Sequence, residues 1–139
     1  MKNRFENWKP PRFDKNGMTK WHWKCQHHEK LKIGKHVDIG AFTYINAKHE
    51  VELQDNVQVG SHCSLYTVST IDNKKGKILI KRNAMIGTHS VVMPGVTIGE
   101  NSIIGAFSFV NKNIPSNVIA YGMPVRIIRK LTKKEINQG

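Results

Sequence analysis

The sequence predicts an all-β fold, a parallel β-helix of about four coils built from six-residue repeats, with a cap before it and a short helix after it. Two observations carry this prediction. An aliphatic residue recurs at every sixth position through most of the middle of the chain, and glycine directly follows half of these aliphatic residues. Neither the period of two of an ordinary strand nor the 3.6 of a helix fits this spacing. The repeat anchors are Ile33, Ile39, Ile45, Leu53, Val59, Leu65, Ile80, Ile86, Val92, Ile98, Ile104 and Val110.

A period of six gives one short strand and one turn to each flat side of a prism. Three such sides return the chain to its starting side after eighteen residues. Equivalent strands of successive coils are then hydrogen-bonded about 4.8 Å apart, so the anchors stack in columns. The position four residues after many anchors is small or β-branched, which suits the inside of a corner: Thr43, Val57, Cys63, Ala84, Ser90, Val96, Ser102 and Ser108.

Departures from the period define the other elements. Residues 1–32 precede the repeat and are predicted to form an N-terminal cap, with Trp8, Trp21 and Trp23 as apolar cover. Residues 116–139 follow the repeat and form the predicted C-terminal tail, which ends in a short helix over 130–137.

The predicted β-helix spans 33–115. Two extra residues near 46–52 predict a small bulge, and nine extra residues within 66–79 predict a loop that leaves the prism. The four expected coils are 33–52, 53–79, 80–97 and 98–115.

The net charge of +12 lies on the flanks and not on the repeat. Residues 1–36 carry ten Lys/Arg against three Asp/Glu, and 112–139 carry six against one, whereas 37–111 carry six of each. Basic flanks suit nucleic acid, anionic lipid or small phosphorylated ligands, and they are equally typical of a solvated surface. Aromatic residues do not interleave with Lys/Arg on the repeat as stacking platforms require, so no nucleic-acid partner is expected.

The composition indicates the compartment. No apolar run approaches the roughly 20 residues of a membrane span, and the first residues lack the apolar stretch of a secretory signal. Two cysteines, Cys25 and Cys63, are too few for a disulfide framework. We therefore expect a cytoplasmic protein without membrane insertion.

One stretch of the repeat carries a family resemblance. Residues 86–115 read IGTHSVVMPGVTIGENSIIGAFSFVNKNIP, and residues 120–129 read AYGMPVRIIR. This pattern resembles the hexapeptide-repeat acetyltransferases, in particular the sugar and galactoside-type enzymes of surface-polysaccharide biosynthesis, over roughly residues 31–130. The resemblance implies a left-handed β-helix, coenzyme A as the acyl carrier with acetyl-CoA as co-substrate, and a homotrimer with three active sites between neighbouring subunits.

The resemblance also implies positions for the cofactor. Thr88 and Ala106 stand where the family lines the pantetheine arm, one coil apart. Lys112, Arg126 and Arg129 stand where they would meet the nucleotide phosphates. Without the resemblance, Thr88 and Ala106 would read as ordinary corner residues.

The catalytic base departs from the family pattern. Residues 66–79 contain no histidine, although galactoside-type relatives carry theirs in that loop, and Ala47 stands where the serine acetyltransferases have a histidine. His62 and His89 each lie three residues after an anchor, so they are expected to stack one strand spacing apart.

Three interpretations of this histidine pair remain open. The two rings form an outward polar ladder or a subunit contact. Alternatively, one is the general base, tuned by the other or by Asp72, with His62 preferred because its coil borders the loop. In the third, an amine acceptor that binds uncharged needs no base.

Other polar segments are weaker candidates. Within the loop, Ser69, Thr70 and Asn73 suit the binding of sugar hydroxyls, although residues 73–76 equally fit an ordinary turn. His49 and Glu50 resemble the catalytic dyad of another branch of the family but lie out of register. The histidines within 21–28 lack a second ligand pair at zinc spacing, so no metal is expected.

These observations favour acetyl transfer from acetyl-CoA to the nitrogen of an amino sugar, linked to a nucleotide. O-acetylation of a sugar or glycan hydroxyl is the alternative within the same class. A non-catalytic β-helix that serves binding or assembly is the alternative from a different class.

Overall fold

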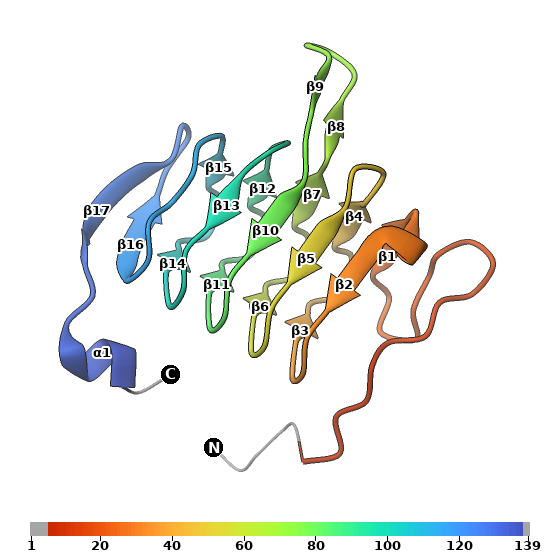
Figure 1. Ribbon diagram of the computed structural model, residues 1–139, viewed down its shortest axis with the longest axis horizontal. Coiled ribbons are helices and arrows are strands. Elements are labelled where there is room, and N and C mark those ends of the chain that lie inside the picture. The colour runs from red at the N-terminus through yellow and green to blue at the C-terminus, as the bar shows by residue number, and fades with distance from the viewer. Residues whose placement is uncertain (1–5, 138–139) are drawn as a thin grey trace.

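The computed structural model describes residues 6–137, in which three sheets of mainly parallel strands wrap around one core (Figure 1). Sheet A contains β1 (Lys24–Gln26), β4 (Tyr44–Asn46), β7 (Ser64–Tyr66), β12 (Val91–Val92) and β15 (Phe109–Val110). Sheet B contains β2 (Leu31–Ile33), β5 (Val51–Leu53), β10 (Ile78–Ile80) and β13 (Thr97–Ile98). Sheet C contains β3 (Asp38–Ile39), β6 (Gln58–Val59), β11 (Met85–Ile86), β14 (Ile103–Ile104), β16 (Val118–Tyr121) and β17 (Arg126–Lys130).

The register of these strands is the one that the six-residue period predicts. In sheet A, Ile45 pairs with Leu65, Leu65 with Val92, and Val92 with Val110, always between parallel strands. The anchors are buried except Ile33, which packs against the core at its N-terminal end. The predicted all-β parallel β-helix is therefore confirmed.

The predicted number of coils was too small, since residues 6–137 form about five turns and not four. Strand β1 pairs with β4, which sets Cys25 beside Ile45, and β16 pairs with β14, which sets Ala120 beside Ile104. Both Cys25 and Ala120 are fully buried in the columns. A column accepts a small apolar residue as well as an aliphatic one, so counting aliphatic anchors alone ended the repeat too early at both ends.

The extra residues within 66–79 form an antiparallel hairpin, β8 (Val68–Ser69) and β9 (Lys74–Lys75). Figure 1 shows this hairpin rising away from the prism at the corner between sheets A and B. Ile71, at its tip, is 96% exposed. The hairpin thus places polar residues of one coil well outside the core.

The C-terminal helix is shorter than predicted. Strand β17 runs antiparallel to β16 as far as Lys130, and α1 spans only Lys133–Asn137. The start of α1 is set by a capping box, in which Thr132 Oγ1 accepts from the Glu135 amide (3.1 Å) and Glu135 Oε1 accepts from the Thr132 amide (2.9 Å). No helix within residues 6–137 has the length and apolar character needed to span a bilayer.

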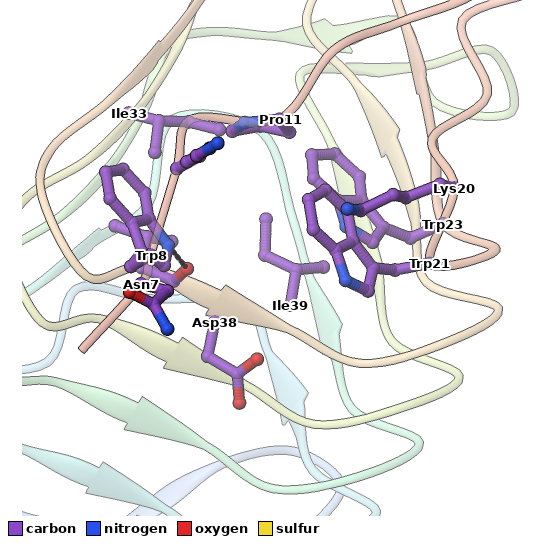
Figure 2. Close-up of a pocket in the computed structure, with 11 residues that line it drawn as sticks. Asn7, Trp8, Pro11, Lys20, Trp21, Trp23, Ile33, Asp38 and Ile39 are labelled. Atoms are coloured by element: carbon purple, nitrogen blue, oxygen red, sulfur yellow. Dashed lines mark hydrogen bonds between the residues drawn. The ribbon is translucent and has the colours of Figure 1, made fainter. Parts of the chain in front are cut away.

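Aromatic residues cover the N-terminal end of the core. Trp23 is buried and meets Phe13 edge to face at 5.4 Å, and Trp8 Nε1 donates to the Val37 carbonyl (2.9 Å). Trp21 stays half-exposed on the wall of a hollow of ≈ 420 Å³, opposite Trp8 (Figure 2). A 3₁₀ turn, His28–Lys30, then leads from β1 into β2.

Two of the three corners are ladders of residues with positive φ. Between sheets B and C, Asn56 donates to Asn83 (3.1 Å), Asn83 to Asn101 (3.1 Å) and Asn101 to Asn117 (2.7 Å) through their side-chain amides. Asparagine tolerates the left-handed region that these turns require, as histidine does. The corner between sheets C and A uses rings instead, and it contains the candidate site.

Candidate active site

Five rings from successive coils form a column along the corner between sheets C and A, stacked except for Phe42 and His62, which meet at 38°. We call this set the ring ladder: His22, Phe42, His62, His89 and Phe107. The expected stacking of the two central histidines is present, with ring centroids 4.6 Å apart and planes 5° from parallel. Phe107 stacks on the other face of His89 at 4.8 Å.

The ring ladder points outward because each of its residues has positive φ at a tight turn. Phe42 and Phe107 are 65% and 58% exposed, a large apolar contribution from surface residues. Clusters of exposed rings typically mark binding surfaces. The ring ladder therefore joins successive coils and is also a candidate binding surface.

The small residues that precede these rings form a track beside them. Thr88 and Ala106 lie one coil apart, as expected, and the Phe107 amide donates to the Thr88 carbonyl (2.9 Å). A Cβ added to Gly87 would lie 2.5 Å from the Ala106 nitrogen, so the two coils touch backbone to backbone. Thr88 and Ala106 thus form a narrow, continuous strip that suits an extended ligand.

The hydroxyl of Thr88 is the centre of a compact polar group. Its Oγ1 lies 2.7 Å from the Ser61 carbonyl oxygen, 2.9 Å from His89 Nδ1 and 3.2 Å from Ser61 Oγ. The Ser61 carbonyl also accepts from the His89 amide (3.1 Å). Hydrogen bonds therefore link the His89 ring, through the Thr88 hydroxyl, to Ser61 of the neighbouring coil, whereas within residues 6–137 the His62 ring has ring contacts only.

The three predicted phosphate ligands lie near the C-terminal end. Lys112 is exposed just beyond β15, and Arg126 is exposed at the start of β17. Arg129 already holds the Glu135 carboxylate through two hydrogen bonds (2.7 and 2.9 Å). Arg129, with help from the Thr132 amide, lowers the pKa of Glu135 to about 2. A phosphate at Arg129 would compete with this carboxylate.

The predicted substrate residues lie on the hairpin. Ser69 pairs with Lys74, Thr70 is exposed at the tip, and Asn73 occupies the turn with positive φ. The Ser69 hydroxyl holds the pKa of Asp72 below its usual value, and the Lys74 amide donates to Asp72 Oδ1 (3.3 Å).

The hairpin and the ring ladder belong to different corners of the prism. Within residues 6–137 of one chain, Asp72 interacts with Ser69 and Lys74 and not with His62 or His89. A single chain therefore does not bring the hairpin residues and the histidine pair together.

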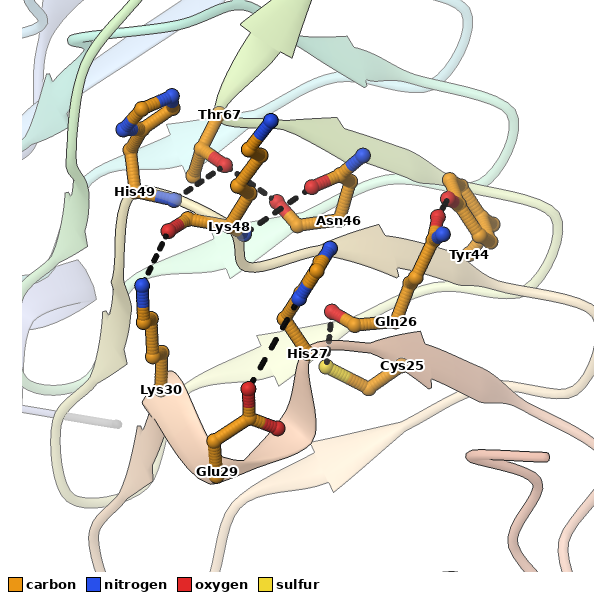
Figure 3. A network of polar contacts seen from close by, with 10 residues as sticks. All are labelled: Cys25, Gln26, His27, Glu29, Lys30, Tyr44, Asn46, Lys48, His49 and Thr67. Carbon is orange, nitrogen blue, oxygen red and sulfur yellow. Dashed lines mark hydrogen bonds and ion pairs between the residues drawn. The ribbon is translucent and has the colours of Figure 1, made fainter. Parts of the chain in front are cut away.

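The neighbouring pair His49 and Glu50 serves structural contacts. The His49 amide donates to Thr67 Oγ1 (3.1 Å), which in turn donates to the Asn46 carbonyl (2.7 Å), as Figure 3 shows. The Glu50 carboxylate lies 2.9 Å from Lys32 Nζ and 3.7 Å from Lys77 Nζ, and the hydrogen bond from Lys32 lowers its pKa.

The histidines within 21–28 also have other partners. His28 stacks on Phe13 at 4.6 Å, His22 belongs to the ring ladder, and His27 Nδ1 lies 3.8 Å from Glu29 (Figure 3). Among residues 6–137, no three side chains of the metal-ligating types gather around a common point.

Sequence reasoning missed Phe42, Phe107 and Ser61. A signal for the two phenylalanines was present, since each lies three residues after an anchor, as His62 and His89 do. Ser61 is found only from the three-dimensional contact with Thr88, because the two are 27 positions apart.

Comparison with known proteins agrees with this architecture. Residues 77–112 match the family model described as bacterial transferase hexapeptide (six repeats). The galactoside O-acetyltransferase of Escherichia coli K12 is 38% identical over 120 residues, which cover 76% of this chain and 59% of that protein. The chain thus spans less than two thirds of that relative.

Solved structures share the fold. A hexapeptide-repeat acetyltransferase from Vibrio cholerae O1 biovar eltor, complexed with acetyl-CoA, superimposes with a TM-score of 0.76 at 28% identity, covering 80% of this chain and 66% of that one. The N-acyltransferase AntD from Bacillus cereus, in complex with dTDP and 3-hydroxybutyryl-CoA, shares the fold at 22% identity and a TM-score of 0.72, with 87% and 82% covered. The six-residue period, the three-sided parallel β-helix and these matches together establish that the chain belongs to the hexapeptide-repeat transferase family.

Proposed function

We propose that this protein is an acetyltransferase that moves an acetyl group from coenzyme A to a sugar. The observation that carries the proposal is the strip formed by Thr88 and Ala106 beside an exposed, oriented His89. The similar Vibrio cholerae protein was solved with acetyl-CoA, and the Escherichia coli relative is an O-acetyltransferase.

Coenzyme A fits the arrangement of these residues. Its pantetheine arm is long and narrow, as is the strip of Thr88 and Ala106 where successive backbones touch. Lys112, Arg126 and Arg129 offer cations for the phosphates at the C-terminal end, because guanidinium and ammonium groups bind phosphate oxygens well. The thioester end would then lie close to His89.

The chemistry needs a proton acceptor near the thioester. As the acceptor nitrogen or oxygen bonds to the thioester carbonyl carbon, it loses a proton to an imidazole of the His62 and His89 pair. The carbon–sulfur bond then breaks and the imidazolium returns this proton to the departing thiolate. Backbone amides of the corner turns are suited to binding the oxyanion that forms in between.

An amino sugar is the favoured acceptor. Asp72, whose pKa the Ser69 hydroxyl lowers further below neutrality, is an anion and would attract an ammonium group more strongly than a neutral hydroxyl. The bound ammonium group would give one proton to solvent before the neutral amine attacks the thioester. Ser69, Thr70 and Asn73 supply hydrogen-bonding groups for ring hydroxyls. A nucleotide diphosphate attached to the sugar would suit the basic flanks of the chain.

O-acetylation of a sugar or glycan hydroxyl is the second candidate. The 38% identity to a galactoside O-acetyltransferase favours it, and both O- and N-acyltransferases are found among proteins with this fold. An essential proton acceptor also suits a hydroxyl better than an amine that binds uncharged.

A homotrimer supports either reaction, because the hairpin and the ring ladder extend from different corners of one chain. Neighbouring copies related by a threefold axis would bring the hairpin of one against the ring ladder of another. Each complete site would then lie between two subunits. Cytoplasmic location and a role in surface-polysaccharide biosynthesis complete the proposal.

The experiment is to mix the purified protein with acetyl-CoA and a panel of acceptors and to measure thiol release. The panel contains nucleotide-linked amino sugars, free amino sugars and galactosides without an amine. Release with the amino sugars alone supports N-acetylation, and release with the galactosides supports O-acetylation. No thiol release with any acceptor would count against the proposed acetyltransferase activity.

A thermal-shift comparison separates the enzyme from a non-catalytic β-helix that serves binding or assembly. Coenzyme A is expected to raise the melting temperature, because a ligand that binds only the folded state stabilises it. A shift with an oligonucleotide and none with coenzyme A would favour the binding module instead.

A further inference from the structure

Within the proposed acetyl transfer, we infer that His89 and not His62 accepts the proton, and that Thr88 and Ser61 are positioning residues that fix the tautomer of His89. The inference rests on the proposed function for its chemistry. Its geometric part concerns the location of one proton and can be measured without any substrate. It also reverses the preference for His62 that the sequence suggests.

The Ser61 carbonyl determines the direction of the first hydrogen bond. A carbonyl oxygen only accepts, so the Thr88 hydroxyl, 2.7 Å away, must donate its single proton to it. The same carbonyl accepts the His89 amide at 3.1 Å, which fixes the backbone of His89 against the neighbouring coil. Both lone pairs of this oxygen are thereby used.

With its proton committed, Thr88 Oγ1 can only accept from its other neighbours. His89 Nδ1, 2.9 Å away, must therefore carry a proton and donate it to Thr88 Oγ1. Ser61 Oγ, at 3.2 Å, donates into the second lone pair of the same oxygen. In the neutral ring the remaining nitrogen, Nε2, then has an unprotonated lone pair.

The ring plane of His89 is also fixed. His62 stacks on one face at 4.6 Å and Phe107 on the other at 4.8 Å, with planes 5° and 9° from parallel. Within residues 6–137, Nε2 of His89 has no hydrogen-bond partner, and the residue is exposed. His89 therefore presents a basic nitrogen to solvent with its orientation set by three neighbours.

His62 lacks these features. Its ring stacks on His89 and meets Phe42 at an interplanar angle of 38°, and across residues 6–137 no hydrogen bond reaches either of its ring nitrogens. Nothing in its surroundings selects one tautomer over the other. Its contribution is to support the His89 ring from one face.

In the inferred reaction, one proton moves from the acceptor to His89 and then to the thiolate. Nε2 of His89 takes the proton of the attacking N–H or O–H while the bond to the thioester carbon forms. Nδ1 keeps its own proton, still donated to Thr88, so the imidazolium is stabilised where it forms. When the carbon–sulfur bond breaks, Nε2 gives its proton to the thiolate, and His89 returns to the neutral tautomer from which it began.

The first experiment determines the tautomer of His89. In ¹⁵N-histidine-labelled protein at alkaline pH, where ordinary imidazole is neutral, the His89 nitrogens are assigned by comparison with His89→Gln. The expected result is a protonated Nδ1 and an unprotonated Nε2. Thr88→Val should shift His89 toward the other tautomer, and Thr88→Ser should keep it. A protonated Nε2 in the wild-type protein, or no change in Thr88→Val, overturns the inference.

Kinetics then test the consequence. His89→Gln should lower kcat by about 10²–10⁴-fold, whereas His62→Gln should lower it by less than about tenfold. Thr88→Val should lower kcat by about 10–100-fold with a small change in the KM for acetyl-CoA. A rise in KM without a fall in kcat would show that Thr88 merely lines the cofactor, and a larger loss in His62→Gln than in His89→Gln would return the base to His62. The expected tautomer with no thiol release from any acceptor would reject the proposed function and leave the tautomer assignment standing.

Discussion

The backbone of the next coil lies so close to Gly87 that only glycine fits at this position. A Cβ at this position would lie 2.5 Å from the Ala106 nitrogen and 2.8 Å from its Cα, both of them backbone atoms. Real Cβ atoms do not approach backbone so closely, and a backbone in a parallel ladder cannot withdraw without losing its hydrogen bonds. Glycine at position 87 therefore lets the two coils approach closely enough to place Thr88 beside Ala106.

Gly87→Ala should destabilise the protein by about 3 kcal/mol, the upper part of the usual range for overpacking. Gly95→Ala is the matched control, because a Cβ there has no atom of residues 6–137 within 4 Å apart from its chain neighbours, and it meets only the strain of a positive φ. Gly95→Ala should cost about 1 kcal/mol. Urea unfolding measures both, and a Gly87→Ala variant as stable as Gly95→Ala would refute the close approach.

The segment formed by β17 and α1 shows how one element is attached to the solenoid. Strand β17 extends sheet C, Leu131 is buried, and the Thr132 and Glu135 capping box starts α1. The two hydrogen bonds between Arg129 and Glu135 join the strand to the helix. The attachment thus depends on a carboxylate that must stay ionised.

The attachment should therefore weaken in acid. The folded-state pKa of Glu135, about 2, lies below the 4.5 of an unperturbed glutamate. A depressed carboxyl pKa contributes stability above the unfolded value, and that contribution is lost as the pH falls through the folded value. The contribution of Glu135 should be complete above about pH 4.5 and disappear toward pH 2.

The measurement is the difference in melting temperature between the wild-type protein and Glu135→Gln as a function of pH. This difference should be positive near neutrality and shrink as the pH drops from 4.5 toward 2. The double variant Arg129→Gln/Glu135→Gln, compared with Arg129→Gln alone, is the control and should show a smaller difference. A difference that stays constant across this pH range would contradict the role of the ion pair.

At the scale of the whole molecule, the candidate functional residues lie at separate corners of the prism. One corner carries the amide ladder of Asn56, Asn83, Asn101 and Asn117, which closes the turns without reactive groups. A second carries the ring ladder with His89, and the third extends the hairpin with Asp72. A site that uses both of the last two must be completed by another copy of the chain.

Subunit mixing should reveal such a shared site. His89→Gln and Asp72→Asn are each expected to be nearly inactive alone, whereas their co-expressed mixture should recover about one quarter of the wild-type activity, the fraction of interfaces with both intact halves. Light scattering should give a mass of three 15.8 kDa chains. Activity of the mixture no higher than the average of its parents, or a monomeric mass, would exclude the arrangement.

The sequence predicted the repeat, its register and the stacking of the histidines because each follows from a fixed period. It missed the outer coils because Cys25 and Ala120 fill their columns without an aliphatic side chain. It began the last helix too early, although Thr132 and Glu135 carry the spacing of a capping box. The contact of Ser61 with Thr88 depends on how two turns superimpose, and a linear pattern contains no direct signal for it.

The ring ladder keeps its alignment although the chain between its members varies in length. Phe42, His62, His89 and Phe107 are separated by 20, 27 and 18 residues, and the surplus of the longest interval is extruded as the hairpin. Under the proposed function, insertions and deletions in the hairpin would change the surface that faces the acceptor while His89 keeps its position. In the proposed enzyme, substrate preference would then diverge through replacement of the hairpin, and the ring ladder would stay unchanged.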